Sequence, residues 1–169
     1  MNPTTPTPYA TSLEEVLWGG LLVAITMALH GFGMLLVLRV SAEFKERFER
    51  SPRLTLGLLQ LVVASWTILI VHLVEVFTWA GFFLWKNAVN TGTGAAANAS
   101  LSYYFALLDY TTLGCEYDLY PRWRLLSGMI AMAGLLTFAW STGVLLTLAQ
   151  DFQDQQVLLY KQRRKKHQS

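Results

Sequence analysis

The sequence has few charged residues and a single cysteine. Charged residues make up 14% of the 169-residue chain, against about a quarter in an average soluble domain. One cysteine, Cys115, excludes an intrachain disulfide and a metal site built from several cysteines. The first apolar run lacks a basic segment before it and is too long for the core of a secretory signal, so we expect no such signal.

Charge is absent from three long stretches. Residues 16–38 and 54–74 hold only His30 and His72 as ionisable groups, and residues 125–150 hold none. Each stretch reaches or exceeds the roughly 20 residues that cross about 30 Å of hydrocarbon. We therefore predict an all-α membrane protein with three transmembrane helices. These are residues 13–40, 54–86 and 122–150.

Shorter segments flank these helices. Ser12 and Glu15 have the spacing of a capping box, which predicts a helix start there. The connection after the first helix is charged, and its helix can continue until Pro52. The flanking segments are an N-terminal arm, a charged connection, an outer loop and a basic tail: residues 1–12, 41–53, 87–98 and 151–169.

Basic residues predict the orientation. Ten of the 13 Lys and Arg residues lie in residues 39–53 and 161–166, which the positive-inside rule places in the cytoplasm. The N-terminus and the connection 86–124 then face outside, and the C-terminus is cytoplasmic. The net charge of +2 follows from this topology, so we expect no nucleic-acid partner. The basic tail either only anchors the chain on the cytosolic side or also contacts membrane lipid.

A short apolar segment lies between the second and third predicted spans. Residues 99–111 are too few to cross a membrane, so they suit a re-entrant or buried segment. The second span ends outside and the third starts outside, so the segment must enter and return. Irregular backbone at membrane depth must be buried in protein or line water. Residues 99–118 therefore have the outline of a pore helix followed by a filter loop.

Residues 111–121, TTLGCEYDLYP, carry a family resemblance. A pore helix, T-T-L-G, an acid, a proline and a long inner helix resemble the potassium channel superfamily, whose filter reads T-V-G-Y-G-D. AMAGLLTFAWST (131–142) resembles its inner helix, and HLVEVFTWAGFF (72–83) resembles the second span of small bacterial three-span ion channels. The resemblance covers roughly residues 54–150. It implies a homotetramer in a bacterial inner (plasma) membrane that conducts ions passively and is not an enzyme.

The resemblance assigns site residues position by position. The expected filter comprises Thr111, Thr112, Leu113, Gly114, Cys115, Glu116, Tyr117 and Asp118. Permeant cations are expected at Thr112, Leu113, Gly114 and Glu116. Gly134 matches the inner-helix hinge, and Phe138 and Thr142 match pore-facing positions. No bound cofactor is implied; the expected permeant ion is K⁺, with Na⁺ and Ca²⁺ as further candidates.

The upper filter departs from the family pattern. This chain continues G-C-E-Y-D, which is one residue longer than G-Y-G-D and lacks the second glycine. Potassium filters use rings of backbone carbonyls in place of the hydration shell of the ion. We therefore expect reduced selectivity for K⁺. The alternative is a non-conducting membrane subunit or scaffold that retains the pore fold.

Acidic side chains around the filter have two interpretations each. Glu116 either faces the ion path, where carboxylates favour divalent cations, or pairs with Arg122 or Arg124. Asp118 either joins that ring or hydrogen-bonds behind the filter, as the filter aspartate of the family does. Asp109, near the negative end of the pore helix, either supports the filter through hydrogen bonds or attracts cations. Cys115 either packs or lines the mouth.

Ionisable residues within the spans form a second candidate group. His72 and Glu75 lie three residues apart, so they share a helix face, and His30 is expected at a similar depth. They either brace the pore loop or form a proton-sensing or metal site. A membrane enzyme that uses His30, His72 and Glu75 is a further rival, but no recognisable nucleophile or complete metal-ligand set accompanies them.

Overall fold

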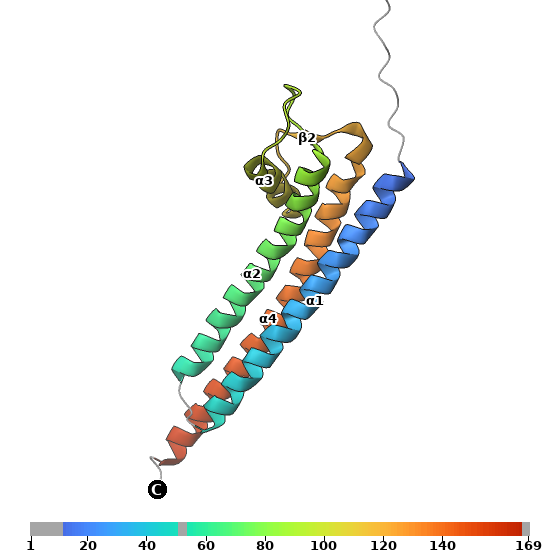
Figure 1. Cartoon of the computed structure of the whole chain (residues 1–169). Coiled ribbons are helices and arrows are strands. Elements are labelled where there is room, and N and C mark those ends of the chain that lie inside the picture. The colour runs from blue at the N-terminus through green and yellow to red at the C-terminus, as the bar shows by residue number, and fades with distance from the viewer. Residues whose placement is uncertain (1–11, 51–53, 167–169) are drawn as a thin grey trace, which may run out of the picture. The chain divides into compact units, whose positions relative to one another are not determined.

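The computed structural model describes residues 12–50 and 54–166, and these residues form an all-α fold (Figure 1). Most of the predicted N-terminal arm, the end of the charged connection with Pro52, and the last three residues of the tail lie outside the described residues. The helices are α1 (Leu13–Arg50), α2 (Leu54–Lys86), α3 (Ala99–Tyr110) and α4 (Leu125–Lys166). Short elements join them: β1 (Val89–Asn90), β2 (Asp118–Leu119) and a 3₁₀ turn (Pro121–Trp123).

Three helices are long and apolar enough to cross a membrane. The candidate spans are Leu13–Phe48, Thr55–Lys86 and Pro121–Lys161, so the chain is a membrane protein. Helix α2 has the predicted bounds. Helix α1 continues past residue 40 to Arg50 and α4 continues past residue 150 to Lys166, because residues 41–50 and 151–166 contain no proline or glycine.

The three long helices contribute to two compact units. Unit 1 comprises the chain up to Met27 together with Glu75–Leu135, and unit 2 comprises Ala28–Val74 together with the chain from Leu136. The core of unit 1 is rich in aromatic residues, whereas aliphatic residues predominate in unit 2. Unit 1 buries Trp79, Phe83, Phe105, Tyr110 and Trp123 among others, and unit 2 buries Met34, Val37, Ala64, Ile68 and Leu148.

Helix α3 is fixed within unit 1 at its start and along one face. The Asn98 side chain caps it by accepting a hydrogen bond from the Leu101 amide at 2.8 Å. Its apolar face packs on α2, with the rings of Phe105 and Phe83 5.5 Å apart. Strand β1 pairs with β2 in antiparallel register, Val89 opposite Leu119, so the segments before and after α3 are joined. The sequence pattern did not predict these two-residue strands.

Helix ends meet at one end of unit 1. The Ser12 hydroxyl caps α1 by accepting from the Glu15 amide at 3.1 Å, as the capping box predicts. The Glu15 carboxylate, however, accepts a hydrogen bond from the amide of Leu125, the first residue of α4. Glu14 also lies 3.9 Å from Lys86, the last residue of α2. The chain between α2 and α4 therefore leaves from and returns to the same end of unit 1.

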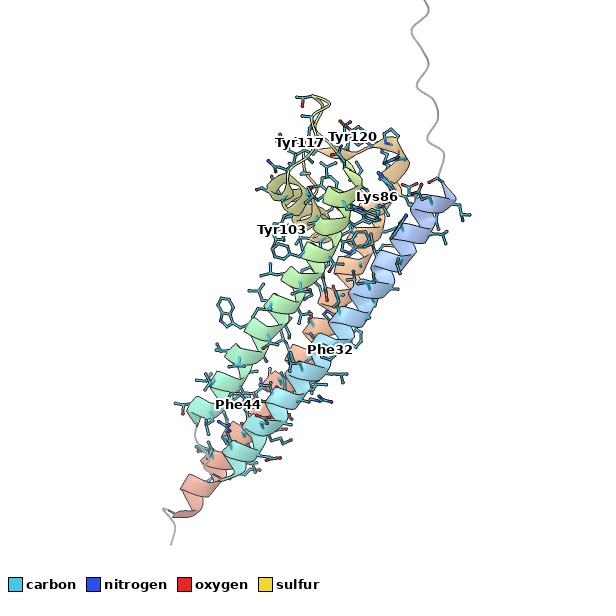
Figure 2. All side chains as sticks on the ribbon, viewed as in Figure 1. Phe32, Phe44, Lys86, Tyr103, Tyr117 and Tyr120 are labelled. Carbon is cyan, nitrogen blue, oxygen red and sulfur yellow. The ribbon has the colours of Figure 1, made fainter. Side chains whose placement is uncertain are left out.

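Tryptophans gather at this end. The amine of Lys86 (labelled in Figure 2) lies 5.1 Å from the ring centre of Trp18, 4.2 Å from Trp85 and 5.8 Å from Trp123. Such cation–π contacts stabilise a cation near apolar surroundings. The contacts with Lys86 therefore bring these three tryptophans together.

Candidate functional site

The TTLG segment ends α3 in a left-handed helix cap. The Thr112 amide donates to the Asp109 carbonyl at 3.0 Å, and the Leu113 amide donates to the Leu108 carbonyl at 2.9 Å. Thr112 itself is the left-handed residue, with a φ of 62°. These are the two hydrogen bonds and the left-handed residue of a Schellman motif. The cap satisfies carbonyls at the end of α3 that would otherwise have no partner.

Threonine is an unusual residue for this conformation. Glycine is the usual residue in this cap, and a positive φ in a β-branched residue is an outlier. Such strain costs about 1–3 kcal/mol and concentrates at functional sites. Gly114, with φ 66°, adopts the same region at little cost. The resemblance to a filter did not predict the cap, because the sequence has threonine where the motif favours glycine.

The backbone amides and the backbone carbonyls of Thr112, Leu113 and Gly114 differ in their hydrogen bonding. The amides of Thr112, Leu113 and Gly114 all donate back to α3. Their carbonyl oxygens accept no hydrogen bond from any residue that the structure describes. All three residues are exposed, and Leu113 retains 76% of its accessible surface. The segment therefore presents acceptors without protein partners beside an uncovered apolar side chain.

Thr111 belongs to the helix end. Its hydroxyl donates to the carbonyls of Leu107 at 2.9 Å and Leu108 at 3.1 Å. The hydroxyl of this expected filter residue is thus hydrogen-bonded to the backbone of α3.

The upper part of the expected filter surrounds a cavity of about 280 Å³ in unit 1. Its lining includes Asp109, Cys115, Asp118, Arg124 and Ser127. Asp118 lies in β2, opposite Asn90, and Tyr117, half-buried, is labelled in Figure 2. The strand pairing fixes the end of CEYD, at Asp118, on one side of this cavity.

Burial dominates the electrostatics of Asp109. The residue is 7% exposed, and its Oδ2 atom has no hydrogen-bond partner among the described residues. Burial raises the pKa of its carboxyl, a hydrogen bond with Ser127 opposes that change, and the charge of Asp118 adds to it. The end of α3 therefore carries a carboxyl whose pKa lies above the ordinary value for aspartate.

Cys115 is a half-buried thiol beside several acids. Its Sγ donates to the Tyr117 carbonyl at 3.5 Å. Burial raises the pKa of the Cys115 thiol, the bond with Tyr117 lowers it, and the charges of Asp109, Glu116 and Asp118 raise it further. The protonated thiol is therefore favoured, and a role as a reactive nucleophile is not.

Glu116 is exposed on the loop. Within the described residues no ion pair joins it to Arg122 or Arg124. Arg122 lies instead over the Trp123 ring, 5.1 Å from its centre. The Glu116 carboxylate therefore remains available to an ion.

Two buried contacts hold the end of α3. The Tyr110 hydroxyl donates to the Glu75 carboxylate on α2. Helix α4 also approaches Tyr110 so closely that a Cβ at Gly134 would meet the Tyr110 carbonyl. Gly134 lies within an unbroken α4. The close approach of Tyr110 explains why this position has no side chain. Glu75 thus contacts Tyr110, the last residue of α3.

In unit 2, His72 lies with other residues that the sequence singled out. Its ring stacks on Phe138 at 4.5 Å and lies 5.3 Å from the His30 ring. Thr142 donates its hydroxyl to the Phe138 carbonyl at 2.8 Å. The sequence reasoning missed Ser141, whose hydroxyl lies between the two imidazoles, because serine in an apolar helix gives no distinctive signal.

Comparison with known protein families, curated proteins and solved structures found no match.

Proposed function

We propose that the chain is one subunit of a homotetrameric pore-loop cation channel. The observation that supports this most is the asymmetry of the TTLG segment, whose amides bind α3 while its carbonyls have no protein partner among the described residues. Four such segments around an axis would form the rings of carbonyl oxygens that replace the hydration shell of a cation. The exposed Leu113 side chain would then be covered by a neighbouring subunit.

The acids set the expected selectivity. Glu116 is exposed without an ion-pair partner in the described part of the chain, and four copies would attract hard divalent cations at the mouth. The negative end of α3 and the carbonyls of Thr112 to Gly114 would hold a monovalent ion. The proposed channel conducts K⁺ and Na⁺ with weak discrimination and binds Ca²⁺ at its entrance.

In this proposal the N-terminus and CEYD lie outside a bacterial inner membrane, and the basic tail lies at the cytoplasmic lipid surface. Motion of α4 near Gly134 would gate the pore. Since Gly134 already contacts the end of α3, such motion would act directly on the filter loop.

Flux through reconstituted protein tests the function. Purified chain in liposomes should pass K⁺ and Na⁺, with a reversal potential in mixed salts that shows weak discrimination. Glu116→Gln should weaken block by Ca²⁺, whereas Glu14→Gln, an exposed acid on α1, should not. A strongly K⁺-selective current would contradict the selectivity, and a tetramer without flux would favour the non-conducting subunit.

A further inference from the structure

Two imidazoles in unit 2 converge on one oxygen atom. The Nε2 atom of His72, on α2, lies 3.1 Å from Ser141 Oγ. The Nε2 atom of His30, on α1, lies 3.3 Å from the same oxygen. All three side chains are buried, and a ring nitrogen of each histidine lies within 4.8 Å of the other. Three helices therefore direct three donor atoms to one point.

Aromatic neighbours fix the ring orientations. His72 stacks on Phe138 with its ring centre 4.5 Å away and the planes 30° apart. His30 packs against Trp140 at 5.3 Å. Imidazoles held by surrounding contacts lose little freedom when they bind an ion. The convergence is thus a property of the packed unit.

We propose that His30, His72 and Ser141 form a binding site for a divalent transition metal of the zinc class. Neutral imidazole is a preferred ligand of Zn²⁺ and its neighbours. Zn–N bonds of about 2.0–2.1 Å at a tetrahedral angle need ring nitrogens about 3.3 Å apart. Each Nε2 atom already lies about this far from Ser141 Oγ, at 3.1 and 3.3 Å. Ser141 Oγ supplies the third ligand and a water the fourth.

The protons in the hydrogen bonds between Ser141 and the two histidines do not prevent metal binding. The Ser141 hydroxyl has one proton, so in the hydrogen-bonded state it can donate to one Nε2 and accept from the other. Metal binding needs a lone pair on both Nε2 atoms. The imidazole that donates its Nε2 proton therefore binds the metal in its other tautomer, with the proton on Nδ1.

The metal would link segments of α1, α2 and α4 within unit 2. A ligand that binds the folded state and not the unfolded chain stabilises the fold. We therefore expect Zn²⁺ to raise the melting temperature of the full-length protein in detergent and EDTA to reverse that increase. This inference does not depend on ion conduction, so its test can fail or succeed separately from the proposed function.

Co²⁺ titration tests the site directly. Metal-free, full-length protein should bind one Co²⁺ per chain, with visible d–d absorption that Zn²⁺ displaces. His30→Gln and His72→Gln should each weaken binding about tenfold or more. His167→Gln changes the third histidine of the chain, which lies outside the described residues, and should bind as the unchanged protein does.

A variant that is expected to bind the metal more tightly keeps the test decisive even if the histidine variants fail to fold. Ser141→Cys, made together with Cys115→Ser, places a thiolate where the three atoms meet. It should bind Co²⁺ more tightly and add a sulfur-to-cobalt charge-transfer band. The inference is overturned if the unchanged protein binds neither metal, if both histidine variants bind normally, or if the thiolate band does not appear.

Discussion

At the residue scale, the buried carboxyl of Asp109 has a measurable consequence. Its pKa is raised chiefly by burial, and its Oδ2 atom has no partner among the described residues. When pH rises from the ordinary Asp range to this raised pKa, the unfolded state ionises first. The unfolded state then binds fewer protons than the folded state, so the free energy of unfolding falls with rising pH over that window.

We predict that Asp109→Asn stabilises the protein at neutral pH. The substitution removes the cost of ionising a buried carboxyl and should raise the melting temperature by about 2–4 °C, the shift that about 1 kcal/mol produces in a chain of this size. Thermal melts in detergent at neutral and acidic pH measure it, and the gain should shrink in acid. Asp154→Asn, an exposed position on α4, is the control; an equal gain there would contradict the assignment.

Predictability also differs between residues. The spacing of His72 and Glu75 predicted a shared helix face, and the structure adds a contact that spacing cannot give, the hydrogen bond from Tyr110 to Glu75. The strained Thr112 could not be predicted, because a threonine at this position normally disfavours the conformation that the cap needs. Likewise, the capping box indicated Glu15 only as a local contact of α1, whereas the hydrogen bond from the Leu125 amide to its carboxylate arises from tertiary packing.

At the element scale, α3 contacts both α2 and α4. The long helices were predictable since each contains a charge-free stretch of spanning length. The pairing of β1 with β2 was not, because two-residue strands are too short to show an alternating pattern. The position of α3 depends on contacts with residues that are distant in sequence. The contact between Gly134 and Tyr110 is the clearest example.

Gly134→Ala should destabilise the protein. The added Cβ would meet the Tyr110 carbonyl, which is backbone and cannot rotate away. We expect a loss of about 1–3 kcal/mol, typical of overpacking. Gly143→Ala on the same helix meets no atom within 4 Å and should gain up to about 1 kcal/mol from helix propensity. Melts of the two variants compare them; equal stabilisation would show that the contact at Gly134 is unimportant.

At the scale of the whole molecule, apolar side chains remain exposed on all three long helices. Leu17 on α1, Trp66 on α2 and Leu136 on α4 are each more than half exposed. Lipid or other copies of the chain must cover such surfaces. The fold of one chain was largely predictable from hydrophobic patterning, whereas assembly depends on complementary surfaces that this patterning does not encode.

Four chains per particle are expected. Native mass spectrometry from mild detergent should give a tetramer, because one chain cannot enclose an ion path. Leu113→Glu introduces a charge at an exposed apolar position of the loop and should reduce the tetramer fraction if this residue faces a neighbour. Monomers throughout would contradict the proposed channel.

The single cysteine reports the orientation. A membrane-impermeant thiol reagent should label Cys115 from outside intact cells, and labelling should accelerate in alkaline solution since the thiol pKa is raised. Cys115→Ser provides the blank. Labelling that requires permeabilised cells would reverse the predicted topology.

The bond between Glu15 and Leu125 bears on the order of assembly during synthesis. A ribosome completes α1, α2 and α3 before it makes the amide that the Glu15 carboxylate binds. Until then, the start of α1 carries a carboxylate without this donor. Nascent chains arrested before residue 125 should consequently leave Glu15 accessible to water. Glu15 should become buried only after α4 has been synthesised.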